Sequence, residues 1–352
     1  MKEPLYKKIY HELYAQIQSG ELPPESRVPT EKELSEKYQV SRITSKRALT
    51  ELEQNQLIYR IQGSGSFVRR PIQPQSKGKV LFILPFANDL SLGNFTEGIY
   101  PVMQEEGFEL MLTPVDYLEQ TTAEALSEEF DGMIYYASNT NSNYDLLFEL
   151  ASHGFPVVTL DKALHEFSFP AVLADNFEGG QLATAHLLAQ GHQRIGYIFG
   201  EGHHPQSVRQ RYLGYVDQLK SQQAPFRTKL DDPQALLPAA VPYIQQNQLT
   251  AAVCENDLVA IELMRQLKQA GLQIPSDFAV IGFDDIQAAA LVDPPLSTVK
   301  QDFAELGRLA GTKLMQMIQS DTNALASSPF EEANAENQKV AVSLVVRNST
   351  IA

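Results

Sequence analysis

The chain has 352 residues, of which 43% are hydrophobic and 20% are charged, and its formal net charge is −15. This globular composition provides enough residues for two or three domains. No apolar run approaches the ~18 residues of a membrane span, and the first residues lack the apolar segment of a secretory signal, so we expect neither. Cys254 is the only cysteine and excludes an internal disulfide, which favours a cytoplasmic location.

Charge is distributed unevenly along the chain. Residues 1–70 hold twelve basic and nine acidic side chains, whereas the rest of the chain holds sixteen basic and thirty-four acidic ones. A basic segment on an acidic protein is expected where one end of the chain meets a polyanion. Because an excess of three charges is small, the pattern within residues 1–70 has to decide the question.

Two helices are predicted first in this segment. An apolar residue every four positions, from Ile9 to Ile17, predicts one apolar stripe on a helix that ends at Gly20. Thr30 and Glu33 then have the spacing of a capping box, which predicts the start of a second helix.

A third helix and a hairpin follow. Ser41 can cap the third helix, whose inward-facing residues are Ala48, Leu49 and Leu52. Residues 57–68, LIYRIQGSGSFV, have the pattern of two strands joined by a Gly-rich turn. Helix, helix, turn, helix and hairpin, in this order, predict a winged helix-turn-helix domain over residues 1–70.

The start of the third helix has the side chains that DNA binding requires. Arg42 and Lys46 share a face and can reach guanine edges or phosphates, and the hydroxyls of Ser41 and Thr44 suit phosphate oxygens. The alternative is a solvated helix face beside an ordinary hairpin, but the order of all the parts favours DNA binding. We add the next arginine and the wing turn to the predicted DNA contacts: Arg47, Ser64 and Gly65.

Residues 4–69 resemble the winged-helix domain of the GntR family of bacterial transcription regulators. The family core S-R-x-T-V-R-x-A-L is matched at Ser41, Arg42, Thr44, Ala48 and Leu49. Two positions differ, because Ser45 replaces an apolar residue and Lys46 replaces an arginine. The resemblance implies DNA contacts from Lys32, Ser41, Arg42, Thr44, Lys46, Gln62 and Gly63.

A different pattern begins after a polar linker, predicted at residues 71–79. Short continuous apolar runs, such as VLFILP and AVIGFD, alternate with amphipathic segments such as NDLVAIELMRQLKQAG. Such runs are typical of parallel strands that are covered by helices on both faces. We therefore predict an α/β fold with doubly wound parallel sheets, divided into two lobes, and one last strand, VAVSLVVR, after a loop at 323–338.

Polar side chains follow several of these predicted strands, where ligands of open α/β sheets bind. They combine carboxylates, an amide and two cations, which suits hydroxyl groups that both donate and accept hydrogen bonds. The candidates are Asp161, Lys162, Asp175, Arg211, Glu255, Asn256, Asp257, Asp284 and Asp285. The alternative for some of them is a helix cap, which we expect for Asp175 with Asn176 and consider for Asp257.

Residues 79–350 resemble the effector domain of the LacI/GalR regulators, through motifs such as CENDLVA and AVIGFDDIQAAALVDPPLSTVKQDFAELGRLA. The resemblance implies a periplasmic-binding-protein-like fold of two lobes joined by three crossovers, which closes on a sugar. We place the first lobe at 80–171 and 300–325, and the second at 172–299 and 326–352. The implied ligand contacts are Asp161, Lys162, Arg211, Asn256, Asp284 and Gln301, with Asn88, Asp89 and Leu92 in a first loop that departs from the family pattern.

A GntR-like head on a LacI-like body resembles the arabinose regulators of Bacillus and related Firmicutes. We therefore expect a sugar-responsive transcription regulator, most simply a repressor, which binds double-stranded operator DNA as a homodimer and needs no cofactor. A transport receptor would lack the head and carry a signal peptide. An enzyme using Asp284 and Asp285 is disfavoured, because no nucleophile elbow, P-loop or zinc spacing is present, and His203–His204 lacks a metal-binding partner.

The identity of the effector stays open in the sequence. Lys162 and Arg211 could hold sugar hydroxyls, a carboxylate or a phosphate. A sugar phosphate, a sugar acid, a disaccharide or a purine therefore remains an alternative to a simple sugar such as L-arabinose.

Overall fold

The computed structural model describes residues 4–55, 57–61, 64–69, 76–84, 94–136, 143–164, 166–200, 204–230, 232–320 and 337–351. The contacts within the chain divide it into two compact units, Met1–Ser76 and Lys77–Ala352. The predicted linker at 71–79 ends too late, because residues 78 and 79 already belong to the first strand of the second unit.

The first unit has the predicted order of three helices and a hairpin. Its elements are α1 (Leu5–Gln18), α2 (Glu31–Tyr38), α3 (Arg42–Gln54), β1 (Ile58–Ile61) and β2 (Gly65–Val68). The capping box is confirmed, since Thr30 Oγ1 accepts from the amide of Glu33 at 3.2 Å and the Glu33 carboxylate accepts from the amide of Thr30 at 2.7 Å.

One small hydrophobic core holds this unit together. It is formed by buried side chains from all three helices and both strands, including Ile9, Leu13, Leu34, Ala48, Leu49, Leu52, Ile58 and Val68. Ser45 of α3 lies in the same buried face, with an exposed fraction of 0%. Among the described residues, its hydroxyl is buried without a hydrogen-bond partner.

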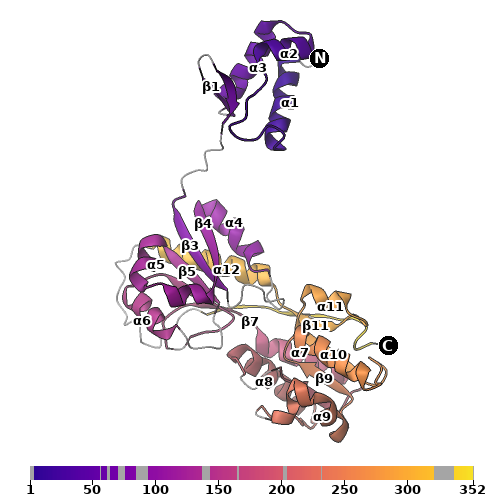
Figure 1. Ribbon diagram of the computed structural model, residues 1–352. Coiled ribbons are helices and arrows are strands. Elements are labelled where there is room, and N and C mark those ends of the chain that lie inside the picture. Colours follow the sequence, from indigo (N-terminus) through magenta and orange to yellow (C-terminus); the bar gives the residue numbers. More distant parts are fainter. Residues whose placement is uncertain are drawn as a thin grey trace. The chain divides into compact units, whose positions relative to one another are not determined.

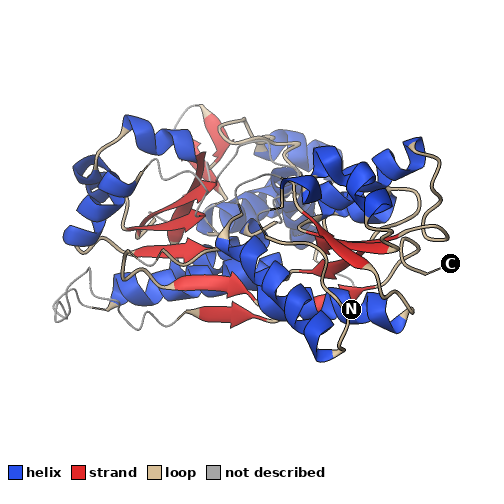
Figure 2. Ribbon diagram, turned by 90° about the horizontal axis from the view of Figure 1, so that it is seen from below, coloured by secondary structure: helices blue, strands red, loops and turns tan. Residues whose placement is uncertain are grey.

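The first lobe of the second unit is built on a sheet whose described strand pairs are all parallel, with helices on both sides (Figure 2). In the described residues the strand order is β12-β7-β6-β5-β3-β4. The strands are β3 (Gly78–Leu84), β4 (Phe108–Pro114), β5 (Gly132–Tyr136), β6 (Val157–Leu160), β7 (Ala171–Ala174) and β12 (Gln338–Val340). The helices are α4 (Thr96–Glu106), η1 (Val115–Gln120), α5 (Ala123–Glu129), α6 (Tyr144–Ser152) and α12 (Phe303–Gln319).

Continuous apolar strands have both faces buried in this lobe. Along β3, Val80 and Phe82 pack in one hydrophobic cluster, while Leu81 and Ile83 pack in another with α5 and α6. The helix α12, which is far away in the sequence, packs against α4 and against β5 to β7 (Figure 1).

The second lobe has a sheet with the described order β13-β11-β10-β9-β8. Its strands are β8 (Ile195–Ile198), β9 (Ala251–Cys254), β10 (Ala279–Asp284), β11 (Ser297–Lys300) and β13 (Ser343–Val345). Its helices are α7 (Asn176–Ala189), α8 (Gln206–Ser221), η2 (Pro233–Ala235), η3 (Leu237–Ala239), α9 (Ala240–Gln246), α10 (Asp257–Gln269) and α11 (Gln287–Leu291). The sheet is parallel except for β13, which pairs antiparallel with β11.

Three connections between the lobes are visible in the described chain: β7 to α7, β11 to α12, and β12 to β13. The predicted lobe ranges need two corrections. Strand β7 completes the first sheet instead of opening the second lobe, and β12 returns to the first sheet, where it pairs with β7. The segment VAVSLVVR, predicted as one strand, is therefore divided between two sheets.

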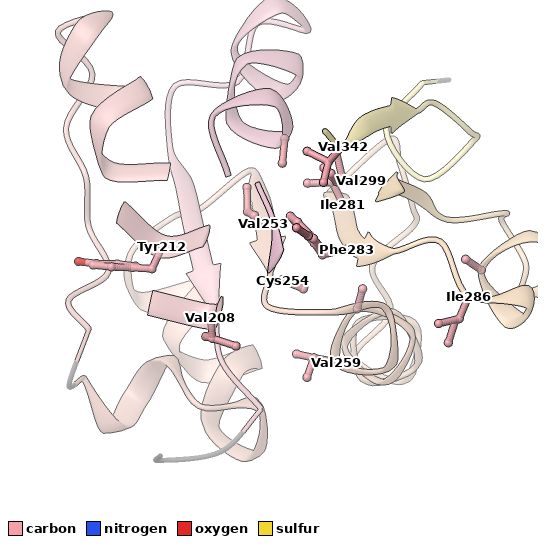
Figure 3. Close-up of a cluster of buried hydrophobic side chains, with 14 of the residues drawn as sticks. Val208, Tyr212, Val253, Cys254, Val259, Ile281, Phe283, Ile286, Val299 and Val342 are labelled. Atoms are coloured by element: carbon pink, nitrogen blue, oxygen red, sulfur yellow. The ribbon is translucent and has the colours of Figure 1, made fainter. Parts of the chain in front are cut away.

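The third connection is fixed by packing. Figure 3 shows Val342, which lies between β12 and β13, in a buried cluster with Ile281 and Phe283 of β10 and Val299 of β11. Cys254 at the end of β9 belongs to the same cluster, and its burial raises the pKa of the thiol.

The first prediction concerns Ser45. Replacing it by alanine removes a buried hydroxyl that has no partner and should raise the unfolding free energy of the first unit by about 1–2 kcal/mol. Ser35→Ala is the matched control, because the Ser35 hydroxyl donates to the carbonyl of Val40 at 2.6 Å and its loss should destabilise the unit. Hydrogen exchange of α3 amides in the full chain measures both changes, and slower exchange in Ser35→Ala than in Ser45→Ala would contradict this account.

Candidate functional site

The first turn of α3 presents basic side chains to solvent. Arg42 and Lys46 are exposed, whereas Ser45, which lies between them in the sequence, is buried. Ser41 Oγ caps the helix by accepting from the amide of Thr44 at 3.2 Å, and it lies 2.9 Å from Thr44 Oγ1. This turn therefore combines exposed cations with the partial positive charge of a helix N-terminus, which attracts phosphate.

Arg47, the third predicted cation of this helix, has a partner inside the unit. Its guanidinium lies 4.0 Å from the centre of the Tyr6 ring and donates to the Tyr6 hydroxyl at 3.3 Å. This cation–π contact joins α3 to α1. The sequence did not indicate it, because the two residues are far apart along the chain.

The other predicted DNA contacts lie on α2 and the wing. Lys32 is exposed, 3.9 Å from Glu36, a distance at which an exposed ion pair contributes little to stability. Ser64 and Gly65 form the described end of the hairpin turn, and Gly65 has a φ of 120°, which favours glycine. Gln62 and Gly63 lie outside the described residues.

In the second lobe, a close approach of two helices positions a buried arginine. A Cβ added at Gly180 of α7 would lie 2.0 Å from the carbonyl oxygen of Arg211 in α8. A Cβ added at Gly214 would likewise lie 2.0 Å from the carbonyl oxygen of Phe177. Only glycine permits this backbone contact, which places Arg211 at the buried junction of the two helices.

The Arg211 guanidinium, 5% exposed, is surrounded by acceptors. Nε donates to Asn176 Oδ1 at 2.8 Å, Nη1 donates to the Glu255 carbonyl at 2.6 Å, and Nη2 lies 3.4 Å from Asp284 Oδ1. Its flat face lies 3.8 Å above the Phe283 ring. These contacts compensate the cost of burying a charge and fix the orientation of the planar group.

The carboxylate that pairs with Arg211 stands on a strained turn. Asp284 has a φ of 114° and Asp285 a φ of 58°, in a region that non-glycine residues rarely occupy. Asp284 Oδ1 also accepts from Gln301 Nε2 at 2.6 Å, and Asp285 Oδ1 accepts from Arg347 Nη2 at 2.6 Å. Strain of this kind costs about 1–3 kcal/mol for each residue and is concentrated at functional sites.

The first lobe contributes a carboxylate and an ammonium group after β6. Asp161 has a φ of 68°, and its Oδ2 accepts from the hydroxyl of Ser207, in α8 of the second lobe, at 3.2 Å. Gln206 Oε1 accepts from the amide of Ala163 at 3.3 Å, so the lobes meet here. Burial lowers the pKa of the adjacent Lys162, while the charge of Asp161 opposes this shift.

At the start of α10, Asn256 is the helix cap and Asp257 is not. Asn256 caps the helix, because its Oδ1 accepts from the amide of Val259 at 2.8 Å. Asp257, considered as a cap, is instead fully buried, and accepts from the Thr298 hydroxyl at 2.6 Å and from the amide of Ile286 at 2.9 Å.

The structure thus brings together Arg211, Asp284 and Gln301 in the second lobe, and Asp161 with Lys162 in the first. Asn88, Asp89 and Leu92 lie outside the described residues. The expected cap at Asp175 is confirmed, since its Oδ1 accepts from the amide of Glu178 at 3.1 Å. Sequence reasoning missed the roles of Asn176, Ser207 and the Glu255 carbonyl, for which no sequence motif gave a signal.

The described residues form neither a metal-binding cluster nor a membrane-spanning helix. No group of three His, Cys, Asp or Glu side chains there is arranged to hold a metal ion. His203 lies outside them, while His204 stacks on Phe199 with ring centres 4.2 Å apart. None of the described helices has the length and apolarity to cross a membrane.

Comparisons with known proteins match both units. Residues 5–68 match the family described as bacterial regulatory proteins, gntR family, and residues 184–350 match the periplasmic binding protein-like domain. The arabinose metabolism transcriptional repressor of Geobacillus stearothermophilus is 31% identical over 341 residues, covering 91% of this chain and 93% of the relative. The chain belongs to this family of transcriptional repressors.

Other members and structures agree with this assignment. The arabinose metabolism transcriptional repressor of Halalkalibacterium halodurans is 24% identical over 99% of this chain and 97% of its own length. A LacI family transcriptional regulator from Enterococcus faecalis V583, solved with bound ribose, is 29% identical, with a TM-score of 0.61 over 77% of this chain and 98% of that structure. As a member of this repressor family, the chain is a DNA-binding regulator and not an enzyme.

The second prediction concerns the buried carboxyl group of Asp257, in the second unit. Burial, and then the negative charge of Asp284, raise the pKa of Asp257 from 3.8 to about 8, against the hydrogen bonds from Thr298 and Ile286. Between about pH 4 and pH 8 the folded chain therefore keeps a proton on Asp257 that the unfolded chain has already released. This group's contribution to stability is present at low pH and is lost as the pH rises through this window, by up to about 1.4 kcal/mol per pH unit.

Asp257→Asn, which imitates the protonated carboxyl group, should remove this decline. Urea unfolding at pH 5 and pH 8 should show the variant gaining stability relative to the natural chain at the higher pH. Asp302→Asn, at an exposed cap of α12, controls for general effects of the substitution. If the unfolding free energies of Asp257→Asn and the natural chain differ by the same amount at both pH values, Asp257 does not titrate in this window.

Proposed function

We propose that the protein is a cytoplasmic, homodimeric repressor of carbohydrate-utilisation genes that a neutral sugar such as L-arabinose releases from operator DNA. The observation that carries the proposal is the pairing of charges at the effector site. Arg211 is engaged with Asp284 in the second lobe, and Lys162 stands beside Asp161 in the first.

These charges balance, which favours a neutral ligand. A phosphate or a carboxylate would need a cation that is not already neutralised, whereas the Arg211 guanidinium is directed to Asn176, the Glu255 carbonyl and Asp284. Sugar hydroxyls can donate to Asp161 and Asp284 and accept from Lys162. A pentose or another neutral polyol therefore fits this site better than a sugar phosphate or a sugar acid.

The names of the relatives support this ligand class. Two relatives that span nearly all of this chain are repressors of arabinose metabolism, and a solved relative of the body holds ribose. We extend this to the present chain, with L-arabinose as the first candidate effector.

A homodimer is proposed because each chain has one predicted recognition helix, α3. A two-fold dimer would place two copies of α3 on the two halves of a palindromic operator. Sugar bound between the lobes would favour their closed arrangement and weaken DNA binding, and DNA must then weaken sugar binding by the same factor.

The third prediction separates ligand classes in the full chain. L-arabinose, D-ribose, a disaccharide, a pentose phosphate, a sugar acid and a purine are compared by thermal unfolding. A neutral pentose at about 100 times its Kd should add about 2.7 kcal/mol to the unfolding free energy, while the anionic compounds should add little. Stabilisation by a sugar phosphate or a sugar acid alone would overturn the argument from balanced charges.

Arg211→Lys tests the site itself. The variant keeps the positive charge but loses the planar guanidinium. The apparent Kd for the sugar, measured from thermal unfolding, should therefore rise at least tenfold. Arg209→Lys in the same helix is the matched control, because Arg209 is exposed and should leave the response unchanged. An unchanged response of Arg211→Lys would place the effector elsewhere.

The fourth prediction distinguishes two neighbouring arginines. Arg42→Ala should lower affinity for operator DNA about tenfold or more, leave thermal stability unchanged and reduce the salt dependence of binding. Arg47→Ala should lower the thermal stability of the first unit, because it removes the contact with Tyr6. Gel-shift titrations at several salt concentrations, with thermal unfolding, measure both, and full affinity of Arg42→Ala would refute the proposed DNA face.

A further inference from the structure

An isoleucine stands at the exposed start of α3. Ile43 is 80% exposed, the highest exposed fraction among the large apolar side chains that the structure describes. It directly follows Arg42 in the first turn of the helix. Single exposed apolar residues are common on protein surfaces, so its surroundings have to show whether it has a function.

The helix directs Ile43 away from the core. At about 100° per residue, Ser45 and Leu52 lie on nearly the opposite side of the helix, and both are fully buried. Lys46, three residues further, shares the exposed face with Ile43. Ile43 therefore adds nothing to the core of the first unit, and a β-branched residue is not favoured in a helix for its own sake.

The side chains next to Ile43 are suited to a DNA groove that presents both anionic phosphates and an apolar group. Arg42 precedes it, Lys46 is exposed beside it, and the capped N-terminus of α3 attracts phosphate. In the major groove, the apolar group at the edge of a base pair is the 5-methyl group of thymine. A branched aliphatic side chain that enters the groove with two cations would bury its surface against such a methyl group.

We propose that Ile43 packs against the 5-methyl group of a thymine in each half of the operator and thereby sets the base preference at that position. The inference rests on the proposed function, because it requires α3 to lie in the major groove of DNA. Arg42 and Lys46 bind phosphates or guanine, whereas Ile43 distinguishes thymine from cytosine and from uracil. Loss of one buried methyl contact should weaken binding about fourfold per half-site, which is about 0.8 kcal/mol.

Replacement of thymine by deoxyuridine tests this contact, because it removes only the methyl group. The full-length protein first selects duplexes from a random-sequence DNA library. Each thymine of the selected duplex is then replaced singly by deoxyuridine, and Kd is measured by gel shift. For the natural chain, replacement at one position in each half-site should raise the Kd for the duplex about fourfold.

The variant Ile43→Ala identifies the protein partner of that methyl group. Ile43→Ala should bind the thymine duplex more weakly than the natural chain does. Deoxyuridine at the sensitive position should not weaken binding of this variant further. Ile61→Ala is the matched control, since Ile61 is an exposed isoleucine of β1, at 45% exposure, and should keep the fourfold loss. Thermal unfolding of Ile43→Ala should match that of the natural chain.

The outcomes separate the inference from the proposed function. If the selection enriches no sequence, DNA recognition itself fails, and the inference with it. If a sequence is enriched but no thymine is sensitive to the loss of its methyl group, the thymine contact is refuted while the proposed function stands. If Ile43→Ala keeps the full fourfold loss at the sensitive position, another residue makes the contact and the inference is overturned.

Discussion

A buried guanidinium must have its N–H groups satisfied, and this constraint organises the second lobe. Arg211 can be buried at the junction of α7 and α8 only because Asn176, the carbonyl of Glu255 and the carboxylate of Asp284 accept from it or pair with it. These partners come from the start of α7, the segment after β9 and the end of β10. One side chain thereby fixes three segments relative to one another, and it places a carboxylate in a backbone conformation that such a residue rarely adopts.

The same network reaches the connections between the lobes. Asn176 follows the first connection, and Gln301, which donates to Asp284, lies in the second. Asp285 is held by Arg347, which follows β13 and so comes shortly after the third. A ligand that contacts Asp284 and, from the first lobe, Asp161 would therefore act on the segments about which the lobes can move. This arrangement gives a physical route from sugar binding to a change in the arrangement of the lobes.

Local patterns in the sequence predicted what depends on neighbours along the chain. The capping box of Thr30 and Glu33, the caps at Ser41 and Asp175, and the order of the elements of the first unit were all confirmed. What depends on contacts across the fold could not be predicted. The stacking of Arg47 on Tyr6, the division of the last apolar segment between two sheets, and the bonds that the buried Asp257 accepts from Thr298 and Ile286 each require the positions of distant residues. Most of the candidate cations and carboxylates were found from their places after strands, but only the structure shows that Arg211 pairs with Asp284.

We propose that binding of a neutral sugar and binding of operator DNA are coupled within one chain. This coupling is tested most directly by measuring both affinities on the full-length protein. The Kd for a fluorescent duplex obtained by selection is determined by anisotropy with and without saturating L-arabinose, and the Kd for L-arabinose is determined by calorimetry with and without that duplex. We expect each ligand to weaken binding of the other at least fivefold, and by the same factor, because linkage makes the coupling reciprocal. Binding of L-arabinose that leaves the affinity for the duplex unchanged would contradict it.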